Sequence, residues 1–186
     1  MKKFDNIIIL HGCPMSKETV LPKSKRWMNW LEKKLKAKGF NATAPDMPMP
    51  WAPKFNEWKK MIEKINISKN SMIVAHSCAG AFIVRWLLEE KKNIKKLILV
   101  APAKIPERVG DARNDLYNFE LPKNASYIAD ERVVFISNDF LHHLKSFEIY
   151  KKSLNPRVIR LENKVHFLYI WTKTNEFPEL LKEVLK

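Results

Sequence analysis

Glycine and cysteine are both scarce in this chain. Its 186 residues include 4 glycines against 11 prolines, which excludes Gly-rich low-complexity sequence. The two cysteines, Cys13 and Cys78, are too few for a disulfide framework or a four-cysteine zinc site. Long apolar runs are also lacking. The longest span a few residues, as at 7–10 and 97–101, where roughly 18 are needed to cross a bilayer.

The N-terminus does not resemble an export signal. Met1, Lys2 and Lys3 are followed by Asp5 and Asn6, and the next apolar run is too short for the hydrophobic part of a signal peptide. We therefore predict a cytoplasmic protein without a membrane span.

Acidic residues are outnumbered, 20 against 34 basic ones, which gives a net charge of +14. A basic chain raises the question of nucleic-acid binding. However, 27 of the basic residues are Lys and 7 are Arg, whereas specific phosphate and base recognition relies on Arg. The lysines are scattered over helical polar faces, so we expect a solvated surface and no specific nucleic-acid partner.

The overall composition, 46% hydrophobic and 29% charged, is typical of a soluble globular protein. The length favours a single domain over residues 1–186. Short apolar runs alternate with helical patterns, which predicts an α/β fold: a mostly parallel sheet of five to six strands between helices, in three layers and without a large cap domain. Predicted strands cover residues 6–10, 40–44, 71–75, 96–101, 132–137 and 157–161. Predicted helices cover residues 27–35, 55–65, 79–88, 140–151 and 176–186, and an irregular excursion runs from 102 to about 130.

Reactive residues follow four of these strands, and sites in open parallel sheets lie beyond the carboxyl ends of the strands. The third strand is the most informative, because Ala75-His76-Ser77-Cys78-Ala79-Gly80 leads into an apolar helix. This is the layout of a nucleophile elbow, a sharp turn that exposes the serine hydroxyl at the helix N-terminus. The positions two before and two after the serine must be small, and here both are alanine. A plain helix N-cap serine is the structural alternative.

A serine hydroxyl needs a base, and the base needs an orienting carboxylate. In this fold class the chain order is Ser, then Asp or Glu, then His. Ser77, Asp139 and His166 occur in that order, each just past a predicted strand. The backbone N–H groups of Cys78 and of Cys13, in the loop after the first strand, are the candidate oxyanion-hole donors.

Other acids compete with Asp139 for the orienting role. Asp111 and Asp115 lie in the irregular excursion, and Asp130 precedes its predicted strand, at the wrong end of the sheet. Asp46 lies in a Pro-rich turn ahead of the elbow, and we interpret it as structural.

Other histidines compete with His166 for the role of base. His11 and His76 flank the predicted oxyanion loop and nucleophile, where such residues usually pack or bond locally. His142 and His143 are adjacent on a predicted helix and are interpreted as surface or pocket-rim residues. No HExxH-like helix or Cys/His cluster points to a metal, so none is expected.

Cysteine catalysis is a further alternative. A Cys78 thiol could itself be the nucleophile, with Cys13 close by across the oxyanion hole. The elbow places Ser77 at its tip, however, and should direct Cys78 into the fold.

With these motifs the sequence resembles the serine hydrolase family of small α/β-hydrolases typified by retinoblastoma-binding protein 9 and the YdeN-type proteins. The resemblance rests on segments along nearly the whole chain: 6–12, 27–35, 47–50, 75–80, 97–102, 137–139 and 165–167. It implies a lidless α/β-hydrolase fold with Ser77, Asp139 and His166 at the family's catalytic positions. The chain departs from the family at Ala75, Ala79 and Val165, where the family usually has glycine. It also departs in the acid turn, which is shorter than the family's usual one.

We therefore expect a serine hydrolase, most simply a carboxylesterase that forms an acyl-enzyme from small acyl esters without a cofactor. His11, Trp51, Phe140 and Phe167 are candidate residues of its substrate pocket. The rival hypothesis is a weakly active or inactive scaffold that serves as a protein- or nucleic-acid-interaction module. The acyl group, the leaving group and the oligomeric state are left open by the sequence.

Overall fold

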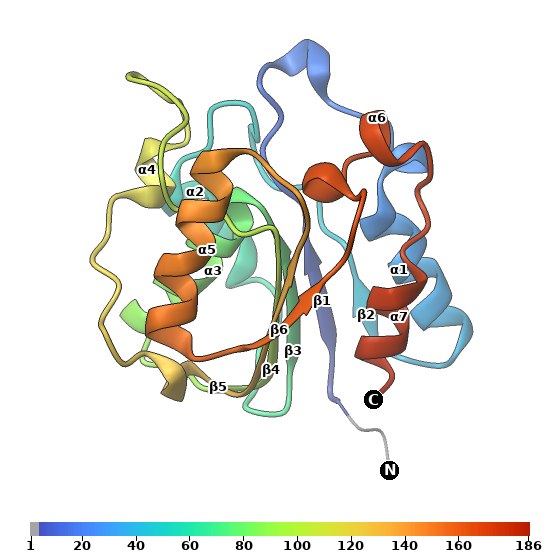
Figure 1. Ribbon diagram of the computed structural model, residues 1–186. Coiled ribbons are helices and arrows are strands. Elements are labelled where there is room, and N and C mark those ends of the chain that lie inside the picture. The colour runs from blue at the N-terminus through green and yellow to red at the C-terminus, as the bar shows by residue number, and fades with distance from the viewer. Residues whose placement is uncertain (1–3) are drawn as a thin grey trace.

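The computed structural model of the protein describes residues 4–186, so the Met1-Lys2-Lys3 start lies outside it. Its centre is one sheet of six parallel strands in the order β2-β1-β3-β4-β5-β6 (Figure 1). The strands are β1 (Ile7–Leu10), β2 (Ala42–Thr43), β3 (Met72–His76), β4 (Ile94–Val100), β5 (Ala129–Ile136) and β6 (Arg157–Arg160). This confirms the predicted α/β fold and its parallel sheet.

Helices cover both faces of the sheet. On one face lie α1 (Trp27–Ala37) and α7 (Pro178–Val184); on the other lie α2 (Phe55–Ile62), α3 (Cys78–Glu89) and α5 (Leu141–Leu154) (Figure 1). The two short helices are α4 (Asn114–Tyr117) and α6 (Tyr169–Thr172), and single 3₁₀ turns η1 to η4 cover Lys17–Thr19, Lys23–Lys25, Ser126–Ile128 and Val165–Phe167. The three layers agree with the prediction, and no large cap covers the sheet within residues 4–186.

The central strands are held by burial on both faces, which explains their unbroken apolar runs. Because side chains alternate along a strand, Ile7 and Ile9 of β1 join the core beneath α1 and α7, whereas Ile8 and Leu10 join the core beneath α2, α3 and α5. All five residues of β3 are buried. The carboxyl ends of these strands are therefore fixed at one edge of a rigid sheet.

Some predicted boundaries were wrong. The second strand is only two residues long, because the chain before it completes the end of α1: Gly39 adopts φ 82° and the Phe40 N–H bonds to the Leu35 carbonyl. β5 begins earlier than predicted, because Ala129 pairs with Ile94 of the long strand β4. Asp130 consequently lies inside β5 rather than before it, still far from the carboxyl end. No helix within residues 4–186 is both long and apolar enough to cross a membrane.

Candidate active site

The turn between β3 and α3 holds Ser77 in an unusual backbone conformation. Its φ of 53° and ψ of −124° are rarely adopted by residues other than glycine, and such strain costs about 1–3 kcal/mol unless the surroundings enforce it. Here they do: the Ser77 N–H donates to the Val100 carbonyl, and the Ser77 carbonyl accepts from the N–H groups of Gly80 and Ala103. The backbone is thus locked, with the serine at the N-terminus of a buried helix.

Close packing around this turn requires small residues. A Cβ atom on Gly12 would lie 2.9 Å from the Ser77 Cβ, so the loop after β1 rests directly against the serine. A Cβ atom on Gly80 would lie 3.1 Å from the Pro102 Cβ. Ala75 and Ala79 are fully buried, and the turn accommodates the methyl group of each.

The structure brings Ser77, His166 and Asp139 into hydrogen-bond contact. The Nε2 atom of His166 lies 3.0 Å from the Ser77 Oγ, and its Nδ1 atom lies 2.7 Å from the Asp139 Oδ2. Each residue follows the carboxyl end of a different strand: Ser77 follows β3, Asp139 follows β5, and His166 lies in η4 after β6. Residues separated by 89 and 27 positions in the chain therefore meet at one point.

Burial and hydrogen bonding set the protonation states of His166 and Asp139. Burial lowers the pKa of His166 below its usual 6.5, and the hydrogen bond to Asp139 opposes this effect only in part. Burial tends to raise the pKa of Asp139, but hydrogen bonds from His143 and His166 hold it well below its usual value. At neutral pH the carboxylate is charged and the imidazole neutral. His166 then donates from Nδ1 to Asp139 and accepts the Ser77 hydroxyl proton at Nε2.

His76 supports the loop that carries His166. Its Nε2 atom donates to the His166 carbonyl at 2.9 Å. Full burial lowers the pKa of His76 to about 3, so it stays neutral and acts as a fixed donor. This agrees with the local structural role that we expected for it.

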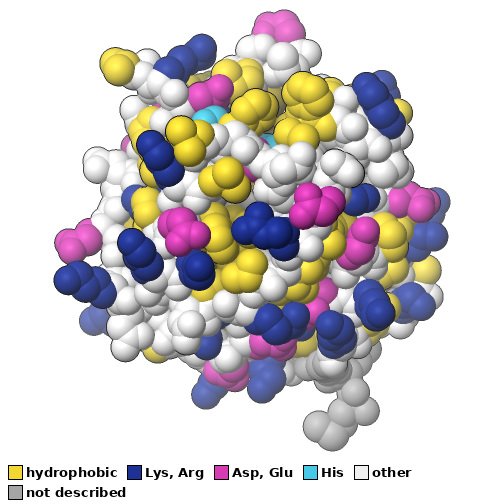
Figure 2. Space-filling model, in the orientation of Figure 1, with side chains coloured by type: hydrophobic (Ala, Val, Ile, Leu, Met, Phe, Trp, Pro, Cys, Tyr) yellow, Lys and Arg dark blue, Asp and Glu magenta, His cyan; other side chains and the backbone are white. Residues whose placement is uncertain are grey.

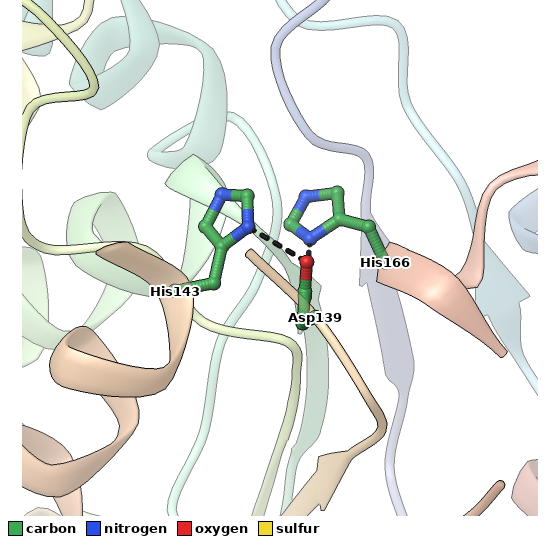
Figure 3. Close-up of side chains that lie close together, drawn as sticks. All are labelled: Asp139, His143 and His166. Carbon is green, nitrogen blue, oxygen red and sulfur yellow. Dashed lines mark hydrogen bonds and ion pairs between the residues drawn. The ribbon is translucent and has the colours of Figure 1, made fainter. Parts of the chain in front are cut away.

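A second histidine contacts Asp139, and the sequence analysis missed it. His143 was predicted at the surface or pocket rim. It does line the cavity, as does His142, but its side chain is buried and its Nδ1 atom lies 3.0 Å from the Asp139 Oδ1 (Figure 3). Its ring stacks on that of His166, with centroids 3.9 Å apart and planes at 16°. The i,i+4 spacing of Asp139 and His143 at the start of a helix was the available signal.

One nitrogen or oxygen atom from each of Asp139, His143 and His166 lies within 4.8 Å of the others, the sole cluster of metal-ligating type among residues 4–186. The geometry favours hydrogen bonds over a metal. The Nδ1 atom of each ring lies at hydrogen-bond distance from its own carboxylate oxygen, and a nitrogen that donates a proton to a carboxylate has no lone pair to offer a metal. A bound metal ion needs lone pairs that converge on one centre.

Cys13 and Cys78 form a disulfide, with their Cα atoms 6.0 Å apart. The bond joins the loop after β1 to the first residue of α3, immediately next to Ser77. Their proximity was expected, but the bond was not. No free thiol is left in the described chain, so the alternative in which the Cys78 thiol is the nucleophile is wrong for this structure.

The two cysteines joined by the disulfide also carry the backbone N–H groups that we expected as oxyanion-hole donors. The Cys78 N–H lies in the first turn of α3, where helical N–H groups have no partner within the helix. Within residues 4–186, the Cys13 N–H donates to no backbone carbonyl. Both groups are therefore free to bind an acceptor from outside the chain.

A cavity of about 1000 Å³ opens beside Ser77. Hydrophobic side chains surround this hollow at the upper end of the molecule in Figure 2. All four predicted pocket residues line it: His11, Trp51, Phe140 and Phe167. Two of them also have structural roles, since His11 accepts the Met47 N–H at Nε2 and Phe167 stacks on Phe177.

The mouth of the cavity has an apolar rim, of which the sequence indicated only Phe140. It is formed by Met15, Met49, Phe140, Ile170 and Trp171, each about half exposed. These residues come from three separate loops and the short helix α6, so no hydrophobic periodicity marks them. Exposed apolar groups around a cavity are typical of a binding site for an apolar ligand.

Comparison with protein families matches residues 7–181 to the family described as serine hydrolase. This chain belongs to the serine hydrolase family. Among individual proteins, YdeN of Bacillus subtilis (strain 168) is 30% identical over 99 residues, and the match covers 51% of this chain and 49% of YdeN. The aligned part thus spans about half the length of this relative.

Solved structures show that the fold is that of α/β-hydrolases. The crystal structure of the B. subtilis ydeN gene product matches with a TM-score of 0.82 at 20% identity, over 97% of both chains. A carboxylesterase of Nitrososphaera gargenis matches with a TM-score of 0.65 at 13% identity, over 99% of this chain and 90% of the other. The carboxylesterase CesB of B. subtilis matches with a TM-score of 0.58 at 13% identity, over 100% and 84%.

Proposed function

We propose that this serine hydrolase is a carboxylesterase in which Ser77, His166 and Asp139 form the catalytic triad. The observation that carries the proposal is the continuous hydrogen-bond chain from the Ser77 hydroxyl through His166 to Asp139. Two carboxylesterases among the structural neighbours support the choice of esters as substrates. The rival role as an inactive scaffold does not explain why the three side chains are aligned.

The geometry supports a two-step reaction. Ser77 attacks the ester carbonyl while His166 accepts the hydroxyl proton at Nε2, and Asp139 stabilises the imidazolium that forms. The N–H groups of Cys13 and Cys78 stabilise the oxyanion, each contributing on the order of 10²-fold. His166 then protonates the leaving alcohol, which departs and leaves an acyl-enzyme. Water activated by His166 cleaves the acyl-enzyme and frees the acid. The scheme requires no cofactor.

The cavity supports esters with an apolar acyl group. Its volume of about 1000 Å³ is at the upper end of the range for small-molecule sites, and its rim is apolar. We propose small-molecule esters as substrates, and the cytoplasmic location remains a prediction.

An ester chain-length series tests this function. We expect the purified protein to hydrolyse p-nitrophenyl esters, with kcat/KM rising from acetate to a medium-chain acyl group as the chain fills the cavity. p-Nitroanilides of the same acyl groups serve as the matched control for amide cleavage and should react far more slowly. A protein that hydrolyses none of these esters contradicts the proposal.

The pH profile of kcat/KM should report the lowered pKa of His166. His166 must be neutral to accept the serine proton, so activity is full above its pKa and falls as the pH drops through it. Because burial lowers that pKa, the acid limb should have its midpoint below pH 6.5. The measurement is kcat/KM between pH 4 and 9 in buffers of constant ionic strength. A midpoint above 6.5 would show that burial does not control this group.

A further inference from the structure

Both oxygens of the Asp139 carboxylate are occupied by histidines from different parts of the chain. Oδ2 faces the Nδ1 atom of His166 at 2.7 Å, and Oδ1 faces the Nδ1 atom of His143 at 3.0 Å. Figure 3 shows the carboxylate below the two neighbouring rings, each joined to it by a dashed line. The Phe140 N–H also donates to Oδ1, at 2.7 Å. The triad as proposed uses only the His166 contact.

His143 is itself held rigidly. It lies in the first turn of α5, and its N–H donates to the Phe140 carbonyl. One face of its ring stacks on His166, and the ring of His142 lies with its centroid 4.0 Å away. The side chain is thus confined by its helix, by a stacked ring and by a hydrogen bond.

We propose that His143 is a positioning residue that fixes the Asp139 carboxylate and the His166 ring in the alignment needed for proton transfer. This inference rests on the proposed esterase function of the same site. His143 lines the cavity, but its hydrogen bond goes to Asp139 and its ring stacks on His166, so we infer that it acts through these two neighbours.

Two contacts give His143 this role. Without His143, Oδ1 would keep only the N–H of the adjacent Phe140 as a donor, whereas the ring of His143 adds a second donor from α5 to that oxygen and restricts turning about the Cβ–Cγ bond. The stacked ring of His143 in turn restricts tilting of His166, whose backbone has a φ of 48° in η4. Small losses of alignment are costly, since a displacement of about 1 Å can reduce a rate by about 10²-fold.

The pKa of His166 provides a second measurement of the role of His143, independent of kcat. The titratable groups facing His166 are Asp139 after β5, His142 and His143 on α5, and His76 at the end of β3. Glu107 and Arg113 face His142 from the loop after β4. Positive charge on His143 opposes protonation of His166. Removing the imidazole of His143 should therefore raise the pKa of His166.

Two substitutions separate the contacts of His143. His143→Asn places a side-chain N–H near the position of Nδ1 and removes the ring. His143→Phe keeps a stacked ring and removes the donor. We expect H143F to lower kcat about 10- to 100-fold, with a smaller change in KM, and we expect H143N to restore most of the wild-type kcat.

The second measurement is an NMR titration of the histidine side chains in the resting protein, which needs no substrate. We expect the pKa of His166 to rise in both variants, and the low-field Nδ1 proton of His166 to remain sharp in H143N and to broaden in H143F. Thermal unfolding of each variant shows whether it is folded at the assay temperature.

The outcomes are distinct. Wild-type kcat in H143F together with an unmoved His166 titration would overturn the inference, because His143 would then only fill space. A lowered kcat in both variants while the low-field Nδ1 proton of His166 stays sharp in both would also overturn it, because the loss would then not come from a misaligned His166. If the wild type hydrolyses no ester, the proposed function fails, whereas a shifted His166 titration in the variants still supports the positioning role.

Discussion

Replacing Ser77 or His166 with alanine is expected to lower kcat for ester hydrolysis by about 10⁶-fold, and replacing Asp139 by about 10⁴-fold. The hydrogen-bond chain makes the three residues act as a unit: without the serine there is no nucleophile, without the histidine no base, and without the aspartate no fixed tautomer. For the same reason the losses should not multiply. The double variant S77A/H166A should be about as slow as S77A.

The measurement is steady-state kinetics on the best p-nitrophenyl ester for the wild type, the single variants and the double variant. Ser126→Ala is a suitable control, because Ser126 lies in η3 before β5, at the end of the sheet away from Asp139. It should keep a kcat near that of the wild type. If S77A/H166A loses the product of the single losses, the residues act independently and the triad is wrong.

Removing the Cys13–Cys78 disulfide is expected to lower the free energy of unfolding by about 4 kcal/mol. The bond closes a loop of sequence separation 65, and the chain-entropy model gives a stabilisation of about that size for such a loop. The kcat should fall as well, because the bond links the two segments that carry the proposed oxyanion donors. We expect the loss in kcat without a matching rise in KM.

Urea unfolding and ester kinetics of the variant C13A/C78A, measured beside the wild type with and without dithiothreitol, test this prediction. The reduced wild type should resemble the variant, and the variant itself should not respond to the reductant. Two titratable thiols in wild-type protein that was never reduced would contradict the pairing. Stable disulfides are rare in a reducing cytosol, so the bond does not favour the predicted cytoplasmic location.

The fold was predictable because its signals are local. Buried strands are recognisable in the sequence as short apolar runs, and Gly39 marks the end of α1. The order of Ser77, Asp139 and His166 after three strands was enough to expect them at one edge of the sheet, and the structure places them there in contact. Boundaries were less accurate, because pairing partners such as Ile94 decide where β5 begins.

The disulfide, the contact of His143 with Asp139 and most of the apolar rim were not predicted, because they depend on how separate segments of the chain pack together. Cys13 and Cys78 carry no spacing motif, and their bond follows from the packing of the Gly12 loop on the elbow. The surface or pocket-rim position expected for His143 did not take account of the carboxylate four residues earlier, which its ring contacts. The apolar rim comes from loops and the single-turn helix α6, in which no periodicity separates a cavity wall from ordinary surface.

Labelling with a fluorophosphonate probe tests the central claim most directly, because the probe reacts covalently only with an activated serine. The account predicts one adduct per chain in the intact mass, located by peptide mapping on Ser77 and absent from S77A. A folded wild-type protein that stays unlabelled, or an adduct on any other residue, would contradict it.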